Sequence, residues 1–209
     1  MGYDLRKIED VKAIKVPIGN KTDVQVQVKI IIKLRGAIDL QNISVKLVSN
    51  DSWFNQIDKR WLKNYKEMWN IPEDVYDLLA YFCGEKKPYK KWTRDKRRMF
   101  LDEMSSQEQA TILNFFKENK IIIVNDIIHG RGEFCAEWML VIRKTSLYEW
   151  VLKPIWEVMN YYGNGEIKVS PRWSINIWRI TVQRKWWDGW RDSANMLQFK
   201  IDPTEIMQL

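Results

Sequence analysis

Asp23 and Lys46 have the residue types and the setting of a metal-dependent hydrolase site. A carboxylate suits Mg²⁺, because this hard cation binds oxygen atoms and keeps several water molecules. A lysine beside the cation can orient a water molecule, help to deprotonate it and screen the charge of a phosphate group. The pair therefore predicts phosphodiester hydrolysis, with Asp23 as a metal ligand. The alternative is that Asp23 only starts a strand and that Lys46 is a solvated strand residue.

A β-hairpin is expected to bring these two residues together. Apolar and polar side chains alternate after Asp23, which predicts a strand near 22–34 with one buried face. We expect a turn at Arg35-Gly36 and a second strand at 41–49. Ser44 and Lys46 then share a face, because side chains repeat every second residue. Asp39 is a rival carboxylate that we assign to the turn.

The length and composition predict one α/β domain over residues 1–209, with a mixed central β-sheet flanked by helices. The chain has 209 residues and is 45% apolar, which is typical of a globular protein with a sizeable core. The expected helices are 4–13, 55–69, one opened by Pro72, 105–117 with a capping box at its start, and 147–162. The further expected strands are 121–124, 138–144, 167–169, 175–184 and 196–201.

The charge balance favours an anionic partner. The formal net charge is +7 and the isoelectric point is about 9.3, which favours nucleic acid over a membrane. No apolar run reaches transmembrane length. Cys83 and Cys135 are isolated, which excludes a zinc spacing or a disulfide framework and favours the cytoplasm. A single histidine, His129, argues against His-based catalysis.

Two segments combine basic residues with aromatic or amide side chains. Residues 86–98 hold eight basic side chains and one acidic one, which indicates either a solvated surface or an arm that contacts the phosphate backbone. In residues 170–200, arginines alternate with Asn and Gln, the side chains that bind base edges in the major groove. The alternative for this second segment is an ordinary amphipathic hairpin. The candidate DNA contacts are Lys59, Arg172, Arg179, Gln183, Arg184, Lys185, Arg191, Asn195 and Gln198.

Several longer runs identify a family: KTDVQVQV, NISVKLVSN, FNQIDKRWL, DKRRMF, GRGEFCAEWMLV, ITVQRK and ANMLQFKIDPTE. Through them the chain resembles the type II restriction endonucleases of the PD-(D/E)XK superfamily, and closely the GCGC-cutting HinP-one-I family. The resemblance implies Mg²⁺-dependent cleavage of double-stranded DNA at a short palindrome such as GCGC. It also implies a cytoplasmic enzyme, either a monomer or a homodimer, with a cognate DNA methyltransferase as its genetic partner.

The resemblance also implies roles for particular residues. Asp23 matches the metal-binding aspartate and Lys46 the catalytic lysine. The backbone carbonyl of Val45 would be a further metal ligand, and Gln56 matches an active-site glutamine. Ser44 lies where the family has glutamine, so its shorter side chain is expected to reach a metal only through water. The family's N-terminal helical segment has no counterpart here.

Tryptophan usage departs from the family pattern. The chain has 12 Trp and only 9 Gly. Six of the tryptophans fall where the relatives have glycine, a residue used for positive φ or close backbone approach. We hypothesise that UGA encodes glycine in the source organism and is rendered as tryptophan. The alternative is that Trp186, Trp187 and Trp190 stack on DNA. The six positions are Trp53, Trp173, Trp178, Trp186, Trp187 and Trp190.

Two other functions remain open from the sequence. The chain is alternatively a basic DNA-binding protein without activity, or a structure-selective nuclease such as a junction resolvase. Magnesium-dependent cleavage of linear duplex DNA into discrete fragments separates both from a restriction enzyme.

Overall fold

The chain forms two compact units, each built from separated segments. The computed structural model describes residues 8–16, 21, 23–32, 35–49, 54–144, 148–170, 174–185 and 191–208. The first unit comprises Met1–Trp53, Ile128–Met159 and Pro203–Leu209, and the second comprises Phe54–Ile127 and Asn160–Asp202. The single domain expected over residues 1–209 stays a prediction.

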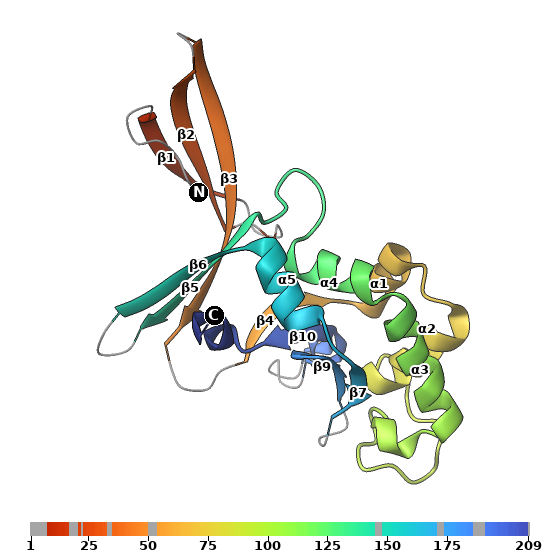
Figure 1. Cartoon of the computed structure of the whole chain (residues 1–209). Helices are drawn as coiled ribbons and strands as arrows, with labels where there is room; N and C mark the ends of the chain where they lie inside the picture. The colour runs from red at the N-terminus through yellow and green to blue at the C-terminus, as the bar shows by residue number, and fades with distance from the viewer. Residues whose placement is uncertain are drawn as a thin grey trace. The chain divides into compact units, whose positions relative to one another are not determined.

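The first unit contains a mixed five-stranded sheet with the order β1-β2-β3-β5-β6 (Figure 1). In this sheet β3 and β5 run parallel, and the other neighbouring strands are antiparallel. The short 3₁₀ helix η4 (Pro203–Gln208) packs against β3, β5 and β6. The strands are β1 (Ile8–Lys15), β2 (Val24–Ile32), β3 (Arg35–Val48), β5 (Trp138–Lys144) and β6 (Tyr148–Pro154).

The long strand β3 changes partner along its length. On one edge it pairs with β2 from Arg35 to Ile43, and on the other edge it pairs with β5 from Ile43 to Val48. Figure 1 shows β2 beside one end of β3 and β5 beside the other. The β2 edge of β3 therefore loses its strand partner directly after Ile43, where the predicted catalytic residues begin.

The second unit contains a five-stranded antiparallel sheet with the order β4-β10-β9-β8-β7. The sequence predicted one sheet, so this second sheet is an addition to the expected architecture. Its strands are β4 (Asn55–Arg60), β7 (Ile167–Val169), β8 (Ile175–Ile177), β9 (Ile180–Arg184) and β10 (Leu197–Ile201).

Aromatic side chains form part of the core of the second unit. Tyr65 stacks on Trp69 with ring centroids 4.6 Å apart, and Phe199 of β10 meets both rings edge-on. The indole Nε1 of the buried Trp69 donates to Asp126 Oδ2 at 2.9 Å, so its polar group is satisfied.

The helices of the described part of the chain are α1 (Leu62–Trp69), α2 (Glu73–Cys83), α3 (Ser106–Glu118), α4 (Lys120–Ile128) and α5 (Ile155–Gly163). Among the described residues, none of these helices has the length and apolarity needed to cross a membrane.

Local signals in the sequence predicted several helices and strands correctly. Ser105 caps α3 through its Oγ, which accepts from Glu108 N at 3.3 Å, while Glu108 Oε2 accepts from Ser105 N at 2.7 Å. This is the predicted capping box. Pro72 precedes α2 as expected, and β5 has the predicted bounds 138–144.

Two predicted helices were wrong over part of their length. Residues 8–13 belong to β1 and pair with β2, although a helix was expected at 4–13; residues 4–7 lie outside the described part. Residues 55–60 form β4 instead of the first half of a helix, because they pair with β10. In both cases distant strand pairing overrides a weak local preference.

Three further elements differ from the prediction. Residues 121–124 lie in α4 and not in a strand, since a short apolar run does not distinguish the two by periodicity. Residues 148–154 form β6, so the helix expected at 147–162 begins only at Ile155. Arg35, Gly36 and Asp39 lie in β3 and not in a turn.

Trp178 has a backbone conformation that favours glycine. It is the first residue of the two-residue turn between β8 and β9, and its φ is +51°. A hairpin turn with positive φ at this first position normally carries glycine. Gly165 lies so close to the Trp178 ring that a Cβ on Gly165 would come within 2.2 Å of it. This conformation supports the codon hypothesis at residue 178, and the other five tryptophans of that hypothesis lie outside the described residues.

Replacing Trp178 tests the strain in this turn. Trp178→Gly is expected to be more stable than Trp178→Ala by about 1 kcal/mol, because both variants lose the ring but alanine keeps the steric cost of positive φ. Urea unfolding of the two variants measures the difference. An alanine variant as stable as the glycine variant would show that the turn carries no such strain.

Candidate active site

Backbone hydrogen bonds place Asp23 beside β3 at the point where β2 begins. The amide N of Asp23 donates to the carbonyl O of Ile43 at 2.9 Å, and its own carbonyl accepts from Val16 N at 3.1 Å. Asp23 is therefore held from both sides by strands of the first unit. Its side chain is exposed to solvent.

The Asp23 carboxylate accepts hydrogen bonds from β3 just beyond Ile43, on the edge where pairing with β2 has ended. Its Oδ2 accepts from Val45 N at 2.6 Å and from Ser44 Oγ at 3.3 Å. The carboxylate thus takes the place of a strand partner for Val45, which would otherwise present an unpaired donor. Both of these bonds use Oδ2, so Oδ1 can accept from water or bind a cation.

The carbonyl of Val45 faces the same edge as the Asp23 carboxylate. In an extended strand the N–H and C=O of one residue point to the same side. Since Val45 N–H points to Asp23, the Val45 carbonyl also points away from β5. This is the position that the sequence assigned to a second oxygen ligand.

Lys46 lies on the face of β3 that also carries Ser44. The two residues stand in register with Met139 and Val141 of β5, whose side chains are buried, and Ser44 itself is only 3% exposed. Burial lowers the pKa of the half-buried Lys46 amine, and the charge of Asp23 acts in the opposite direction. The structure therefore brings Asp23, Ser44, Val45 and Lys46 together.

The buried side-chain amide of Asn42, two residues before Ser44, supports this arrangement. Asn42 is 6% exposed; its N donates to Glu137 Oε2 at 2.8 Å and its Nδ2 donates to the Glu133 carbonyl at 3.0 Å. Its Oδ1 accepts from Gln25 Nε2 of β2 at 3.0 Å. Asn42 thus ties β2, β3 and the segment before β5 where β3 changes partner. The sequence analysis missed it, and its one signal was its place on the Ser44–Lys46 face.

The donor set suits a hard cation that keeps part of its water shell. Among the described residues, no three His, Cys, Asp or Glu side chains form a group that could enclose a metal ion. The site instead offers the Asp23 carboxylate and the Val45 carbonyl. Mg²⁺ is commonly held by one or two carboxylates and completed by water and substrate phosphates, so these residues fit it.

Comparison with known proteins identifies the family. A family model described as R.HinP1I restriction endonuclease matches residues 1–207. The chain belongs to this family. It is therefore a type II restriction endonuclease, a site-specific deoxyribonuclease, as the sequence predicted.

A solved structure agrees with the fold of this restriction endonuclease. The chain is similar to restriction endonuclease MspI, solved in complex with its cognate DNA, with a TM-score of 0.65 and 11% identity. The alignment covers 94% of this chain and 72% of that one. At this identity the likeness establishes the fold alone, and it confirms the predicted α/β class. A search among curated proteins found no significant match.

Gln56 and Lys59 of the restriction endonuclease lie on β4 in the second unit. Gln56 is exposed and stands in register with Lys200 of β10, whereas the half-buried Lys59 stands opposite Gln198. Their roles at the active site and at DNA stay predictions.

The other predicted DNA contacts differ in exposure. Arg191 is exposed, Gln183, Lys185 and Asn195 are half-buried, and Gln198 is buried with its Nε2 donating to the Arg184 carbonyl at 3.3 Å. Arg179 is exposed and its guanidinium lies 4.6 Å from the centre of the Tyr161 ring. Arg172 lies outside the described residues.

Arg184 is buried, with 4% of its surface exposed. Its Nε donates to the Ala194 carbonyl at 3.0 Å and its Nη2 donates to Asn195 Oδ1 at 2.6 Å. Its Nη1 lies 3.7 Å from Asp95 Oδ2. In this structure Arg184 holds the segment before β10, and its assignment to DNA contact stays a prediction.

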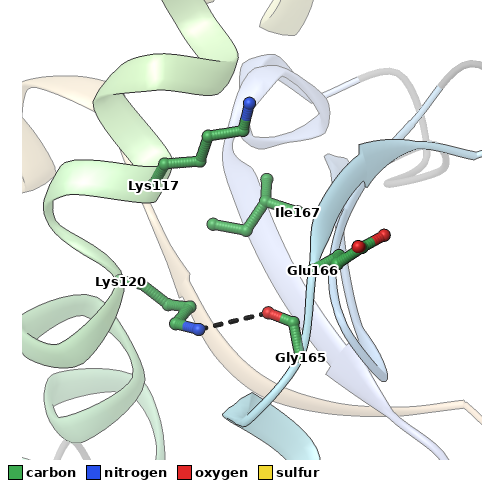
Figure 2. A pocket seen from close by; sticks show the side chains of 5 residues that line it. All are labelled: Lys117, Lys120, Gly165, Glu166 and Ile167. Carbon is green, nitrogen blue, oxygen red and sulfur yellow. Dashed lines mark hydrogen bonds between the residues drawn. The ribbon is translucent and has the colours of Figure 1, made fainter.

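The second unit also has a surface hollow of about 610 Å³ with two lysines on its wall (Figure 2). Lys120 Nζ donates to the Gly165 carbonyl at 3.1 Å, and Lys117 also lines the hollow. Figure 2 shows the Glu166 carboxylate turned away from both lysines. Among the residues that the structure describes, none of those predicted for catalysis or DNA contact lines this hollow.

The lowered pKa of Lys46 predicts a stability cost at the active site. In metal-free buffer at neutral pH, Lys46→Met is expected to raise the free energy of unfolding by about 1 kcal/mol, because the folded state disfavours the charged amine. A folded-state pKa below the unfolded one means that this cost is present at low pH and disappears as pH rises through the ordinary lysine value.

Urea unfolding at neutral and at alkaline pH measures this effect. The increase in the free energy of unfolding of Lys46→Met over the wild type should be smaller at alkaline pH. Lys46→Arg keeps the charge and should show no such increase. A methionine variant no more stable than the wild type at neutral pH would contradict the expectation.

Proposed function

We propose that this restriction endonuclease hydrolyses phosphodiester bonds of double-stranded DNA with Mg²⁺, at a short palindrome that family membership suggests is GCGC. The observation that carries the proposal is the convergence of the Asp23 carboxylate, the Val45 carbonyl edge and the Lys46 amine where β3 changes partner.

Asp23 and the Val45 carbonyl would hold the cation. A bound Mg²⁺ supplies charge stabilisation for the phosphate and lowers the pKa of coordinated water. Ser44 donates to the Asp23 carboxylate, so its hydroxyl orients the ligand and need not reach the metal itself. The serine in place of glutamine is therefore compatible with a working site.

Lys46 is the residue that would handle the proton of the attacking water. It stands in register with the buried Val141 of β5, and burial lowers the pKa of its amine, so a larger fraction is neutral at a given pH than for a solvated lysine. A neutral amine can accept a proton from water, and a charged amine can screen the phosphate. The nearby Asp23 charge acts in the opposite direction and favours the charged amine.

The basic surface would supply affinity for the DNA backbone. The formal net charge of +7 attracts a polyanion, and Arg179 and Arg191 are exposed to solvent. The enzyme would act in the cytoplasm as a monomer or homodimer. A cognate methyltransferase would protect the host's own sites.

The variant Asp23→Asn tests the hydrolytic site. Its amide oxygen can still accept from Val45 N–H, so the fold should be kept, but it binds a cation poorly. Mg²⁺-dependent cutting of a GCGC plasmid should fall at least about 100-fold, or about 2.7 kcal/mol in transition-state stabilisation. Binding of a GCGC duplex with Ca²⁺ in place of Mg²⁺ should change little.

Asp10→Asn is the matched control, because Asp10 is an exposed carboxylate on β1 of the same unit. It should cut at the wild-type rate. Full cutting by Asp23→Asn would place the metal site elsewhere. Wild-type protein that binds duplex DNA but never cuts it would favour the non-catalytic alternative, and cutting of branched DNA alone would favour a structure-selective nuclease.

A further inference from the structure

Trp92 is the most exposed large apolar side chain in the described part of the chain, with 85% of its surface accessible to solvent. It lies in the segment between α2 and α3, and we call residues 85–98 the Trp92 loop. Tryptophan is highly buried on average, because its large ring gains much free energy on leaving water. A ring presented to solvent by a well-anchored loop is therefore unusual.

The loop is anchored on both sides of Trp92. Three residues before it, Tyr89 Oη donates to Glu108 Oε1 of α3 at 2.7 Å. Two residues after it, Arg94 N donates to Glu103 Oε1 at 2.6 Å, and the Arg94 guanidinium lies 4.3 Å from the centre of the Phe100 ring. Trp92 thus stands at a defined position between two fixed points.

The base of the loop is tied to the second-unit sheet. Asp95 Oδ1 accepts from Arg97 N and Arg97 Nε, both at 3.0 Å, and Asp95 Oδ2 lies 3.7 Å from Arg184 Nη1 of β9. Met99 N donates to the Tyr81 carbonyl of α2 at 2.9 Å. These contacts keep the loop in one conformation, so little entropy would be lost when a partner binds.

Several charges of the loop form no ion pair with the residues that the structure describes. Lys86 pairs with Asp77, and Arg94 pairs with Asp102. By contrast, Lys87, Lys91 and Lys96 are exposed and form no ion pair with any residue that the structure describes. Lys91 Nζ lies 6.0 Å from the Trp92 ring. The loop therefore combines one exposed aromatic ring with three ammonium groups that form no ion pair with the described residues.

We propose that the Trp92 loop is a DNA-contacting element, in which the indole lies against bases and deoxyriboses of the duplex while Lys87, Lys91 and Lys96 bind its phosphates. This proposal rests on the proposed function, since it assumes that the protein binds duplex DNA. Aromatic rings gain contact energy from nucleosides of any sequence, and lysines neutralise backbone charge. A second copy of the loop is a poor partner, because the like charges would repel each other.

Two sets of variants separate the two kinds of contact. Binding of a GCGC duplex is measured by fluorescence anisotropy over a range of salt concentrations, with Ca²⁺ in place of Mg²⁺ to prevent cutting. Trp92→Ala should bind about 10-fold more weakly with an unchanged salt slope, and Trp92→Phe should recover part of the loss. The triple change of Lys87, Lys91 and Lys96 to Gln should reduce the slope of log K against log salt by about 2.7, at about 0.9 per phosphate contact.

Matched controls use exposed side chains outside the loop. Trp156→Ala removes a tryptophan that is 66% exposed on α5 and should bind like the wild type. Changing Lys15, Lys144 and Lys168 to Gln removes the same charge from exposed positions elsewhere and should reduce the slope less. Thermal unfolding of each variant confirms that it is folded.

The outcomes distinguish this proposal from the proposed function. If Trp92→Ala binds like the wild type while the wild type cuts DNA with Mg²⁺, the loop proposal is wrong and the proposed function stands. If the wild type neither binds nor cuts duplex DNA, both are wrong. If the wild type sediments as a dimer that Trp92→Ala dissociates without any loss of DNA affinity, the loop contacts a second copy of the chain and not DNA.

Discussion

The hydrogen bond from Val45 N–H to the Asp23 carboxylate determines the geometry of the candidate active site. This bond forms because β3 continues to Val48, whereas its pairing with β2 ends at Ile43. Without the carboxylate, the edge of β3 beyond Ile43 would carry an unpaired amide N–H. A carboxylate that takes this amide is fixed next to a backbone carbonyl on the same edge. Two oxygen donors of different kinds thus meet without a dedicated metal cage.

The Asp23 hydrogen bond satisfies a backbone amide, whereas Lys46 is expected to lower the stability of the fold. The sheet places its amine beside buried apolar side chains, which disfavours the charged form, and Asp23 only partly offsets that effect. A more stable protein would carry an apolar residue at this position. A cost in folding free energy at this position is the pattern expected where a residue serves chemistry instead of packing.

Local signals in the sequence predicted that the candidate catalytic residues share a strand face, but they did not predict the residues that support them. The alternation after Asp23 and the spacing of Ser44 and Lys46 predicted a shared strand face, and the capping box at Ser105 predicted the start of α3. Asn42 bonds to a carboxylate 95 residues further along the chain, which no local pattern could show. The same limit explains β4, whose strand conformation depends on pairing with β10.

Counting charges in the sequence also could not show which of them are available to a polyanion. Arg184 looked like a DNA contact, yet it is buried and bonded to Asn195 and close to Asp95. Lys87 and Lys96, in an equally basic stretch, face solvent. A buried guanidinium must satisfy its donors internally, whereas a solvated ammonium loses little by exchanging water for phosphate. Basic residues that look alike in the sequence therefore differ in the structure: Arg184 is buried and holds a loop in place, whereas Lys87 and Lys96 remain in contact with solvent.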